Sequence, residues 1–542
     1  MNSIPKVPEP RNEPVLPYGP GAPEREALKA ALKRMSGEQV EIPVIVGGRE
    51  IRTGNTETSV MPHDHGHVLA TWHKAGEAEV RQAIDAALAA QRDWARWPWE
   101  ERAAVFLRAA ELLATSWRPV LNAATMLGQS KTAHQAEIDA ACEMIDFFRF
   151  NVHFAEKLYQ EQPISSPGTW NRLDHRPLEG FVYAVTPFNF TSIAGNLPTA
   201  PALLGNVAVW KPAATAVYSG YYIMKLLEEA GLPPGVINFL PGDPAMISDV
   251  LLRHRDLAGV HFTGSTAVFQ SIWRTVGDNI SSYRSYPRLV GETGGKDFIL
   301  AHASADADAL AAAIVRGGFE YQGQKCSAAS RLFIPDNLWP RVRERTLEMV
   351  GQIKVGDPAD FRNFMGAVID RKAYDKITGY IKHAQAADGV EVIAGGKFSD
   401  EQGYFIDPTL VQVKDSGYQL MCEEVFGPVV SLFVYREQDW AETLKIVDRT
   451  TPYALTGAIF ANDRRAIAEA ELELRNAAGN YYINDKPTGA VVGQQPFGGA
   501  RASGTNDKAG SILNLIRWIS PRTIKETLAP PKSFEYPFMA EK

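Results

Sequence analysis

The sequence predicts an α/β fold: a doubly wound parallel sheet followed by a second α/β section. Four apolar runs, at 181–185, 207–210, 236–240 and 259–262, are each followed by a segment that suits a helix. Because these runs are apolar without alternation, they are typical of strands covered on both faces. Strand–helix alternation implies right-handed crossovers and a parallel sheet. Ligands of such sheets bind at the carboxyl ends of the strands.

The section before these strands, from Val80 to Tyr159, is predicted to be helical. Val80, Ile84, Ala87 and Leu88 recur at the spacing of one helix face. The first residues, to about Gly21, are rich in proline and are expected to run as an extended arm over a surface.

After Gly294 a second alternating section runs to about Arg501, with a helix through 305–320 and strands near Leu332 and Val429. The tail is rich in proline and in aromatic residues that we expect to pack on a partner subunit, namely Trp518, Phe534, Tyr536 and Phe538. The predicted oligomer is a homodimer or larger. The predicted division is a first domain of residues 1–158 and 179–293, a catalytic domain of 294–502, and an arm and tail of 159–178 and 503–542.

Composition excludes several functional classes. The chain has 542 residues and a formal net charge of −7, which gives no electrostatic footprint for nucleic acid or for an anionic membrane surface. There is no apolar run of membrane-spanning length and no recognisable leader at the N-terminus, so a cytoplasmic location is expected.

The three cysteines are Cys142, Cys326 and Cys422, whose spacing is too wide for a zinc site. Their odd number and the lack of a secretory signal argue against a disulfide framework. Cys142 falls on the apolar stripe of a predicted helix and is interpreted as a core residue. Cys326 differs, because it lies in the polar segment EYQGQKCSAASR. Lys325 and nearby backbone N–H groups would favour the thiolate there, so Cys326 is the candidate nucleophile.

Two further candidates follow predicted strands. Glu292 lies between glycines in RLVGETGGKD, where a carboxylate in an apolar cleft acquires the raised pKa of a general base. Asn189 lies in VTPFNFT (185–191), at the carboxyl end of a predicted strand, where a side-chain amide can donate to an oxyanion. Taken singly, each also fits an ordinary loop or turn.

Seven segments together resemble the aldehyde dehydrogenases. In the order of that family they are PFNF (187–190), WKP (210–212), FTGST (262–266), GETGGK (291–296), GQKCSA (323–328), EEVFGP (423–428) and PFGG (496–499). The resemblance implies a Rossmann-type NAD-binding domain, a second α/β catalytic domain and a small oligomerisation arm. It also implies that Cys326 attacks an aldehyde, that Asn189 holds the oxyanion, and that Glu292 activates water.

The same resemblance implies NAD⁺ as the cofactor. The residues matching the family's cofactor contacts are Thr186, Pro187 and Phe188 near the nicotinamide, Lys211 at the adenosine ribose, Gly264 and Ser265 at the pyrophosphate, and Glu424 and Phe426 at the nicotinamide ribose. Ala214 stands where the family has an acidic residue, which weakens the expected exclusion of NADP⁺. Val268 and Phe269 replace a frequent glycine, so the pyrophosphate turn is expected to differ.

Three segments, 11–25, 137–151 and 482–507, resemble more closely the branch of that family that oxidises glutamate γ-semialdehyde to glutamate in proline degradation. The resemblance places Ser327, Gly489 and Ala490 at the substrate carboxylate, and Glu143 and Lys325 at the amino-acid head. It also places Phe190 and Phe497 around the methylene chain. Association with proline dehydrogenase is a further expectation.

Alternatives remain at this point. Succinate semialdehyde is a second candidate substrate, and a coenzyme-A-acylating enzyme is disfavoured by Glu292. A catalytically silent protein of the same fold is disfavoured by the intact Cys326, Glu292 and Asn189. The histidines of PHDHGH (62–67) lie among Pro and Gly, which are typical of a turn rather than of a helical metal motif. No metal site is predicted.

Overall fold

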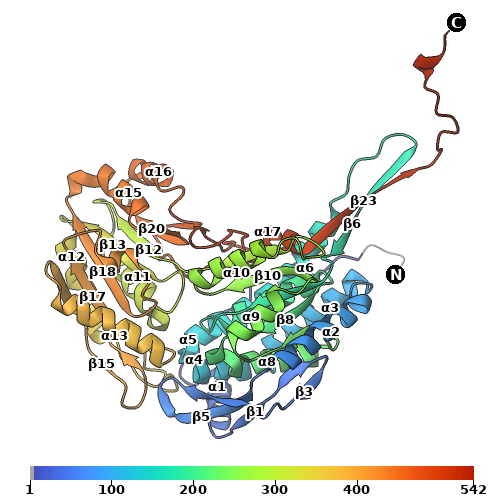
Figure 1. Ribbon diagram of the computed structural model, residues 1–542. Helices are drawn as coiled ribbons and strands as arrows, with labels where there is room; N and C mark the ends of the chain where they lie inside the picture. The colour runs from blue at the N-terminus through green and yellow to red at the C-terminus, as the bar shows by residue number, and fades with distance from the viewer. Residues whose placement is uncertain (1–4, 542) are drawn as a thin grey trace.

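The computed structural model describes residues 5–541. Two large bodies, each built on a seven-stranded sheet, lie side by side, and a long two-stranded arm extends away from them (Figure 1). Within the described part of the chain, no helix is long and apolar enough to cross a membrane.

The first sheet has the strand order β11-β10-β7-β8-β9-β2-β3. Its strands are β2 (Val44–Val46), β3 (Arg49–Ile51), β7 (Phe181–Val185), β8 (Val207–Lys211), β9 (Ile237–Phe239), β10 (Leu257–Thr263) and β11 (Arg288–Glu292). The five strands from β7 to β11 pair in parallel, whereas β2 and β3 close one edge in antiparallel pairing. The four apolar runs therefore form the predicted parallel sheet.

Helices connect the strands of this sheet and cover it. They are α7 (Thr191–Leu203), α8 (Val217–Ala230), α9 (Pro244–Leu252) and α10 (Thr266–Asp278). Every residue of α7 is buried, because helices from the preceding section pack over it. Its sequence is accordingly apolar and small-residue-rich all round.

The predicted helical section is confirmed, but it is divided into several helices. They are α2 (Glu77–Trp94), α3 (Trp99–Ala114), α4 (Arg118–Gln129), α5 (Ala133–Ala136) and α6 (Met144–Gln160). A π-helical segment, η1 (Glu137–Glu143), joins α5 to α6. Such widened turns are frequent at functional sites, because they rotate the side chains that follow them.

The second sheet has the order β14-β17-β18-β13-β12-β20-β21, parallel except for β14 at its edge. Its strands are β12 (Asp297–Ala301), β13 (Ala329–Pro335), β14 (Val390–Ala394), β17 (Thr409–Val413), β18 (Val429–Tyr435), β20 (Thr456–Phe460) and β21 (Asn480–Ile483). The main helices are α11 (Ala307–Phe319), α12 (Trp339–Gln352), α13 (Arg371–Ala386), α15 (Trp440–Arg449) and α16 (Arg464–Glu473). The predicted second α/β section is confirmed.

The arm pairs β6 (Thr169–Pro177) with β23 (Ile519–Thr527) in antiparallel register. Beyond it the aromatic side chains of Phe534, Tyr536 and Phe538 are exposed. The grouping of Trp518 with these tail aromatics is wrong. The Trp518 ring is fully buried in the first body, 4.7 Å from the His261 ring, because the chain crosses that body before it enters the arm.

A small third sheet, β1-β5-β4, lies near the N-terminus, with bounds Val40–Ile42, Asp64–His73 and Thr56–Met61. The histidines of the PHDHGH segment precede or lie on β5 and diverge: His63 contacts Ser130, and His65 and His67 contact the carbonyls of Asp400 and Ser36. Over residues 5–541, no group of side chains is arranged to hold a metal ion.

Candidate active site

The nucleophile candidate lies where the two bodies meet. Cys326 follows α11 and a short 3₁₀ turn, η3 (Glu320–Gly323), and precedes β13. Within η3, Tyr321 and Gln322 have positive φ values of 50° and 53°. Such strain in non-glycine residues persists only where the surroundings enforce it, and it is frequent at active sites.

Cys326 and Glu292 are in contact. The Cys326 thiol donates to Glu292 Oε1 across 3.6 Å. Burial raises the pKa of Glu292 to about 7, although the thiol contact and Lys508 act to lower it. Burial, followed by the charge of Glu292, raises the pKa of Cys326 well above its usual range. The resting pair is therefore a neutral thiol beside a carboxyl poised to accept its proton.

The position of Glu292 is fixed by the close approach of a second backbone segment, around Gly504. It is the last residue of β11 and forms a bridge to Gly504. Gly504 has φ +137°, and a Cβ there would lie 2.3 Å from the Gly291 carbonyl oxygen. Thr505 Oγ1 accepts from the Gly291 N–H at 2.9 Å. Only glycine at 504 lets this segment support the catalytic strand end.

Lys325 does not serve the nucleophile as predicted. Its ammonium is paired with Glu320 at 3.1 Å, and burial lowers the pKa of Lys325. Sequence adjacency to Cys326 suggested activation of the thiol, but successive side chains leave the backbone in different directions. The prediction that Lys325 favours the thiolate is wrong, and Glu292 is the group in contact with the thiol.

Asn189 reaches the loop that carries the nucleophile. It lies between β7 and α7, is buried, and donates from Nδ2 to the Gln324 carbonyl oxygen at 3.0 Å. An amide has two N–H groups, so the second can serve an oxyanion while the first fixes the side chain.

One cavity of about 240 Å³ contains all seven predicted substrate residues together with the nucleophile. They are Glu143, Phe190, Lys325, Ser327, Gly489, Ala490 and Phe497. Apart from Phe497, these residues come from η1, the β7–α7 loop, the nucleophile loop and the segment 488–492. We call this segment the anchor loop.

The anchor loop lies beside the nucleophile loop. Ser327 Oγ donates to Thr488 Oγ1 at 2.8 Å, and Lys486 Nζ donates to the Thr488 carbonyl at 3.2 Å. Gly489 has φ +100°, a conformation that permits the loop to turn its N–H groups toward the cavity. The hydroxyl of Thr488, the ammonium of Lys486 and the backbone of Gly489 and Ala490 line this part of the cavity, and hydrogen-bond donors of these kinds suit a carboxylate.

A neutral carboxyl and an aromatic ring form another part of the cavity. Burial, followed by the charge of Asp139, raises the pKa of Glu143 to about 8, while Ser192 Oγ donates to its Oε2 at 2.8 Å. The Phe190 ring has the buried Lys131 ammonium 4.3 Å from its centre. That ammonium is also paired with Asp139 at 2.7 Å, so the ring is held from behind.

Several cavity residues were missed by the sequence reasoning. They are Asn12, Glu13, Val15, His134, Arg316, Glu320, Lys486 and Thr488, among others. The N-terminal residues belong to the segment 11–25, which was singled out by resemblance without a role. Nothing local in sequence links them to Cys326, which is more than 300 positions away.

The predicted cofactor residues of the first body meet at the carboxyl ends of its strands. Lys211 ends β8, and burial lowers its pKa to about 8, against the opposing charge of Asp243. Thr186 follows β7 and accepts from the Trp210 indole at 2.8 Å. Gly264 and Ser265 follow β10, and Ser265 Oγ caps α10 by accepting from the Val268 N–H. This helix start leaves N–H groups that suit a phosphate.

The other predicted cofactor residues come from the second body. Glu424 Oε1 accepts from the Gly295 N–H at 2.8 Å. The Phe426 ring meets Phe188 edge to face with centroids 5.8 Å apart, so the two bodies are in contact here. Glu424 and Phe426 line a small recess that also includes Cys326. Cys326 lines the substrate cavity as well. The thiol thus lies between them.

The two departures have structural explanations. Ala214 is exposed just after β8, and its methyl side chain presents no carboxylate there. Phe269 stacks on Phe262 in the core of the first body, with ring centroids 5.4 Å apart. It therefore packs in the core, whereas a glycine at this position would leave the turn before α10 more conformational freedom.

Comparisons with known proteins all identify the same family. The family model described as "Aldehyde dehydrogenase family" matches residues 51–523. The mitochondrial delta-1-pyrroline-5-carboxylate dehydrogenase of Dictyostelium discoideum is 52% identical over 538 residues, 99% of this chain and 96% of that protein. The corresponding protein of Agaricus bisporus is 51% identical over 98% of each chain.

Solved structures give the same result. The delta-pyrroline-5-carboxylate dehydrogenase of Mycobacterium tuberculosis bound with NAD is 53% identical, covers 100% of both chains and has a TM-score of 0.97. The Thermus 1-pyrroline-5-carboxylate dehydrogenase with bound NAD is 33% identical, covers 96% of this chain and 99% of that one, and has a TM-score of 0.90.

Proposed function

The chain belongs to the aldehyde dehydrogenase family, and from that premise we propose that it oxidises glutamate γ-semialdehyde to glutamate with NAD⁺ in proline degradation. The observation that carries this proposal is the single cavity that joins the thiol of Cys326 to an anchor loop suited to a carboxylate. The open-chain aldehyde is the form attacked, because the cyclic pyrroline has no free carbonyl.

The residues fit NAD⁺. Lys211 and the start of α10 lie at the carboxyl edge of the first sheet. Glu424 and Phe426 line a recess together with Cys326, and Phe188 packs against Phe426. When bound, NAD⁺ takes two electrons and one hydrogen from the aldehyde carbon. The body of residues 1–158 and 179–293 is assigned to cofactor binding, and residues 294–502 to catalysis.

The first covalent step follows from the Cys326–Glu292 contact. The thiol proton passes to Glu292 as the sulfur bonds to the aldehyde carbon, and the carbonyl π electrons move to its oxygen. The second N–H of the Asn189 amide and the backbone N–H of Cys326 are the donors assigned to that oxyanion, each worth about 2.7–4 kcal/mol in a preorganised site.

After oxidation Cys326 holds the acyl group as a thioester. Glu292, having released its proton to solvent, takes one from water while the water oxygen bonds to the acyl carbon. The carbon–sulfur bond then breaks, and the sulfur leaves and is reprotonated. The net change is aldehyde, water and NAD⁺ to carboxylate, NADH and two protons.

Substrate choice is assigned to the far end of the cavity. The anchor loop and Ser327 hold the substrate carboxylate, Glu143 and Lys325 face the amino-acid head, and the aromatic rings enclose the chain. Succinate semialdehyde shares the carboxylate but lacks the ammonium, so it would leave the Glu143 region without its partner.

One panel of assays tests this proposal. NADH formation is measured with pyrroline-5-carboxylate, succinate semialdehyde and propanal, each with NAD⁺ or NADP⁺ and with or without coenzyme A. We expect pyrroline-5-carboxylate with NAD⁺ to give the highest kcat/KM, independent of coenzyme A. A preference for propanal or succinate semialdehyde would overturn the substrate assignment and leave the reaction type standing.

The arm supports a further proposal, a homodimer or larger homo-oligomer. Its exposed aromatic tail offers apolar surface that a second copy can cover. Light scattering of the full chain and of a variant ending at residue 518 tests this, since loss of the arm should leave monomers. A cytoplasmic location and an association with proline dehydrogenase stay predictions.

A further inference from the structure

The N-terminal residues Asn12–Val15, here called the strap, line the same cavity as Cys326. Asn12, Glu13 and Val15 all contribute to its wall, beside the anchor loop residues Gly489 and Val492. We propose that the strap is a specificity element that holds the anchor loop in place for the substrate carboxylate, with Asn12 as the positioning residue. This inference rests on the proposed function and deepens it.

Asn12 bonds to the anchor loop and to Gln494, two positions beyond its end. Its Nδ2 donates to the Val492 carbonyl at 2.8 Å, and its Oδ1 accepts from Gln494 Nε2 at 2.9 Å. The same Nδ2 donates to Asp146 Oδ2 at 2.8 Å, on α6. One side chain therefore joins this segment to a helix of the first body, using both its donor and its acceptor.

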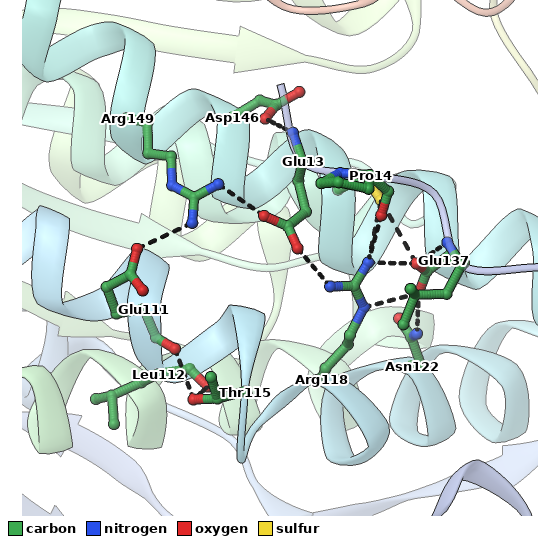
Figure 2. A network of polar contacts seen from close by, with 12 residues as sticks. Glu13, Pro14, Glu111, Leu112, Thr115, Arg118, Asn122, Glu137, Asp146 and Arg149 are labelled. Atoms are coloured by element: carbon green, nitrogen blue, oxygen red, sulfur yellow. Dashed lines mark hydrogen bonds and ion pairs between the residues drawn. The ribbon is translucent and has the colours of Figure 1, made fainter. Parts of the chain in front are cut away.

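Glu13 fixes the strap from the other side. Its carboxylate bridges Arg118 on α4 and Arg149 on α6, at 2.6 Å to each guanidinium (Figure 2). Its backbone N–H donates to Asp146 Oδ1 at 2.7 Å. Glu13 is nearly buried, so these charge-assisted bonds resist competition from water.

The following residues continue the attachment. Arg118 donates to the Pro14 carbonyl at 2.8 Å and to the buried Glu137 carboxylate. Glu137 also accepts from the Leu16 N–H at 2.9 Å and from the Tyr18 hydroxyl at 2.7 Å. The strap is thus held by several buried hydrogen bonds. The anchor loop contains glycine, and its contact with the strap restrains it.

Asn12 lies at the carboxylate end of the cavity and not at the thiol. Its loss should therefore weaken binding of the substrate carboxylate without changing bond formation at Cys326. A general loss of stability would instead affect every aldehyde equally. This difference separates a positioning role from a merely structural one.

The test compares Asn12→Ala and Gln494→Ala with Arg11→Ala, which changes the exposed neighbouring residue. KM and kcat are measured for glutamate γ-semialdehyde and for propanal. We expect the Asn12 and Gln494 variants to raise KM for the semialdehyde about 10-fold, the size of one lost hydrogen bond. The kcat for that substrate, and all constants for propanal, should stay within about twofold of the parent. Arg11→Ala should resemble the parent.

Asn12→Asp should raise KM for the semialdehyde more than Asn12→Ala does. It places a second carboxylate against Asp146 and removes the donor to Val492. Hydrogen exchange of the Ala490–Val492 amides gives a readout without substrate and should be faster in both Asn12 variants. Equal effects on both aldehydes, or unchanged KM and exchange, would overturn the role of the strap. If the parent oxidises propanal but not the semialdehyde, the proposed function fails, and the exchange result still decides the strap.

Discussion

The cavity is bounded by two regions whose buried polar groups are treated in opposite ways. On the thiol side, Cys326 and Glu292 meet at 3.6 Å, and burial raises the pKa of both. On the strap side, burial alone would raise the pKa of Glu137, but bonds from Arg118, Leu16 and Tyr18 outweigh it and lower that pKa. One carboxylate is poised to change its protonation state and the other is fixed as an ion.

The two carboxylates serve different purposes, one reactive and one structural. A base must be able to accept and release a proton near working pH. Glu292 accordingly has few hydrogen bonds that would offset the effect of burial on its pKa. A supporting ion must never change state, so Glu137 is surrounded by donors (Figure 2). Substitutions on the thiol side should therefore affect turnover, and those on the strap side should affect stability or substrate affinity.

The largest expected effect comes from Cys326→Ala. Turnover should fall by roughly 10⁴-fold or more, because no other group can form the thioester. The thermal unfolding temperature should change little, since Ala fits where the buried thiol lay. NADH formation and calorimetry on the same preparation check both statements. Cys142→Ala is the control, and turnover that persists in Cys326→Ala would contradict the chemistry.

Glu292 should determine the acidic side of the pH profile. Below a pKa of about 7 its carboxyl is protonated and cannot accept a proton, so kcat/KM should rise with pH through that value and then level off. Glu292→Gln should lower turnover roughly 10²–10⁴-fold and remove that limb. A variant that keeps the same pH dependence would assign the limb to another group.

Arg118→Met tests the strap side. Removal of one partner leaves Glu137 buried without its cation, which should cost about 3–5 kcal/mol of the free energy of unfolding. The kcat for propanal should be retained in the folded enzyme. Urea unfolding measures the loss. The matched control is Arg253→Met, which breaks the exposed pair with Asp249 and should leave the free energy of unfolding nearly unchanged. Equal losses in the two variants would contradict the distinction.

Asn189→Ala is expected to have the smallest effect of the four. Loss of one oxyanion donor should lower kcat roughly 10²–10³-fold, since the Cys326 N–H remains. Steady-state kinetics with saturating NAD⁺ measure it, with the exposed Asn462→Ala as the control. A raised KM at unchanged kcat would show that the amide serves substrate binding and not the transition state.

The sequence alone determined much of this protein. The apolar runs predicted the parallel strands and their order along the chain, because a strand that is covered on both faces has apolar side chains at consecutive positions. Short motifs then indicated Cys326, Glu292 and Asn189 as candidates, since the glycine and polar residues that flank them serve chemistry more than packing.

Other features depend on contacts between segments that are far apart in the chain. Lys325 turns to Glu320 although it adjoins the nucleophile, and Trp518 is buried although it begins the tail. Asn12 and Val492 become neighbours across 480 positions of sequence only when α6 has packed between distant segments. The raised pKa of Glu292 has the same origin, because burial is a property of the whole fold and not of the residues beside it.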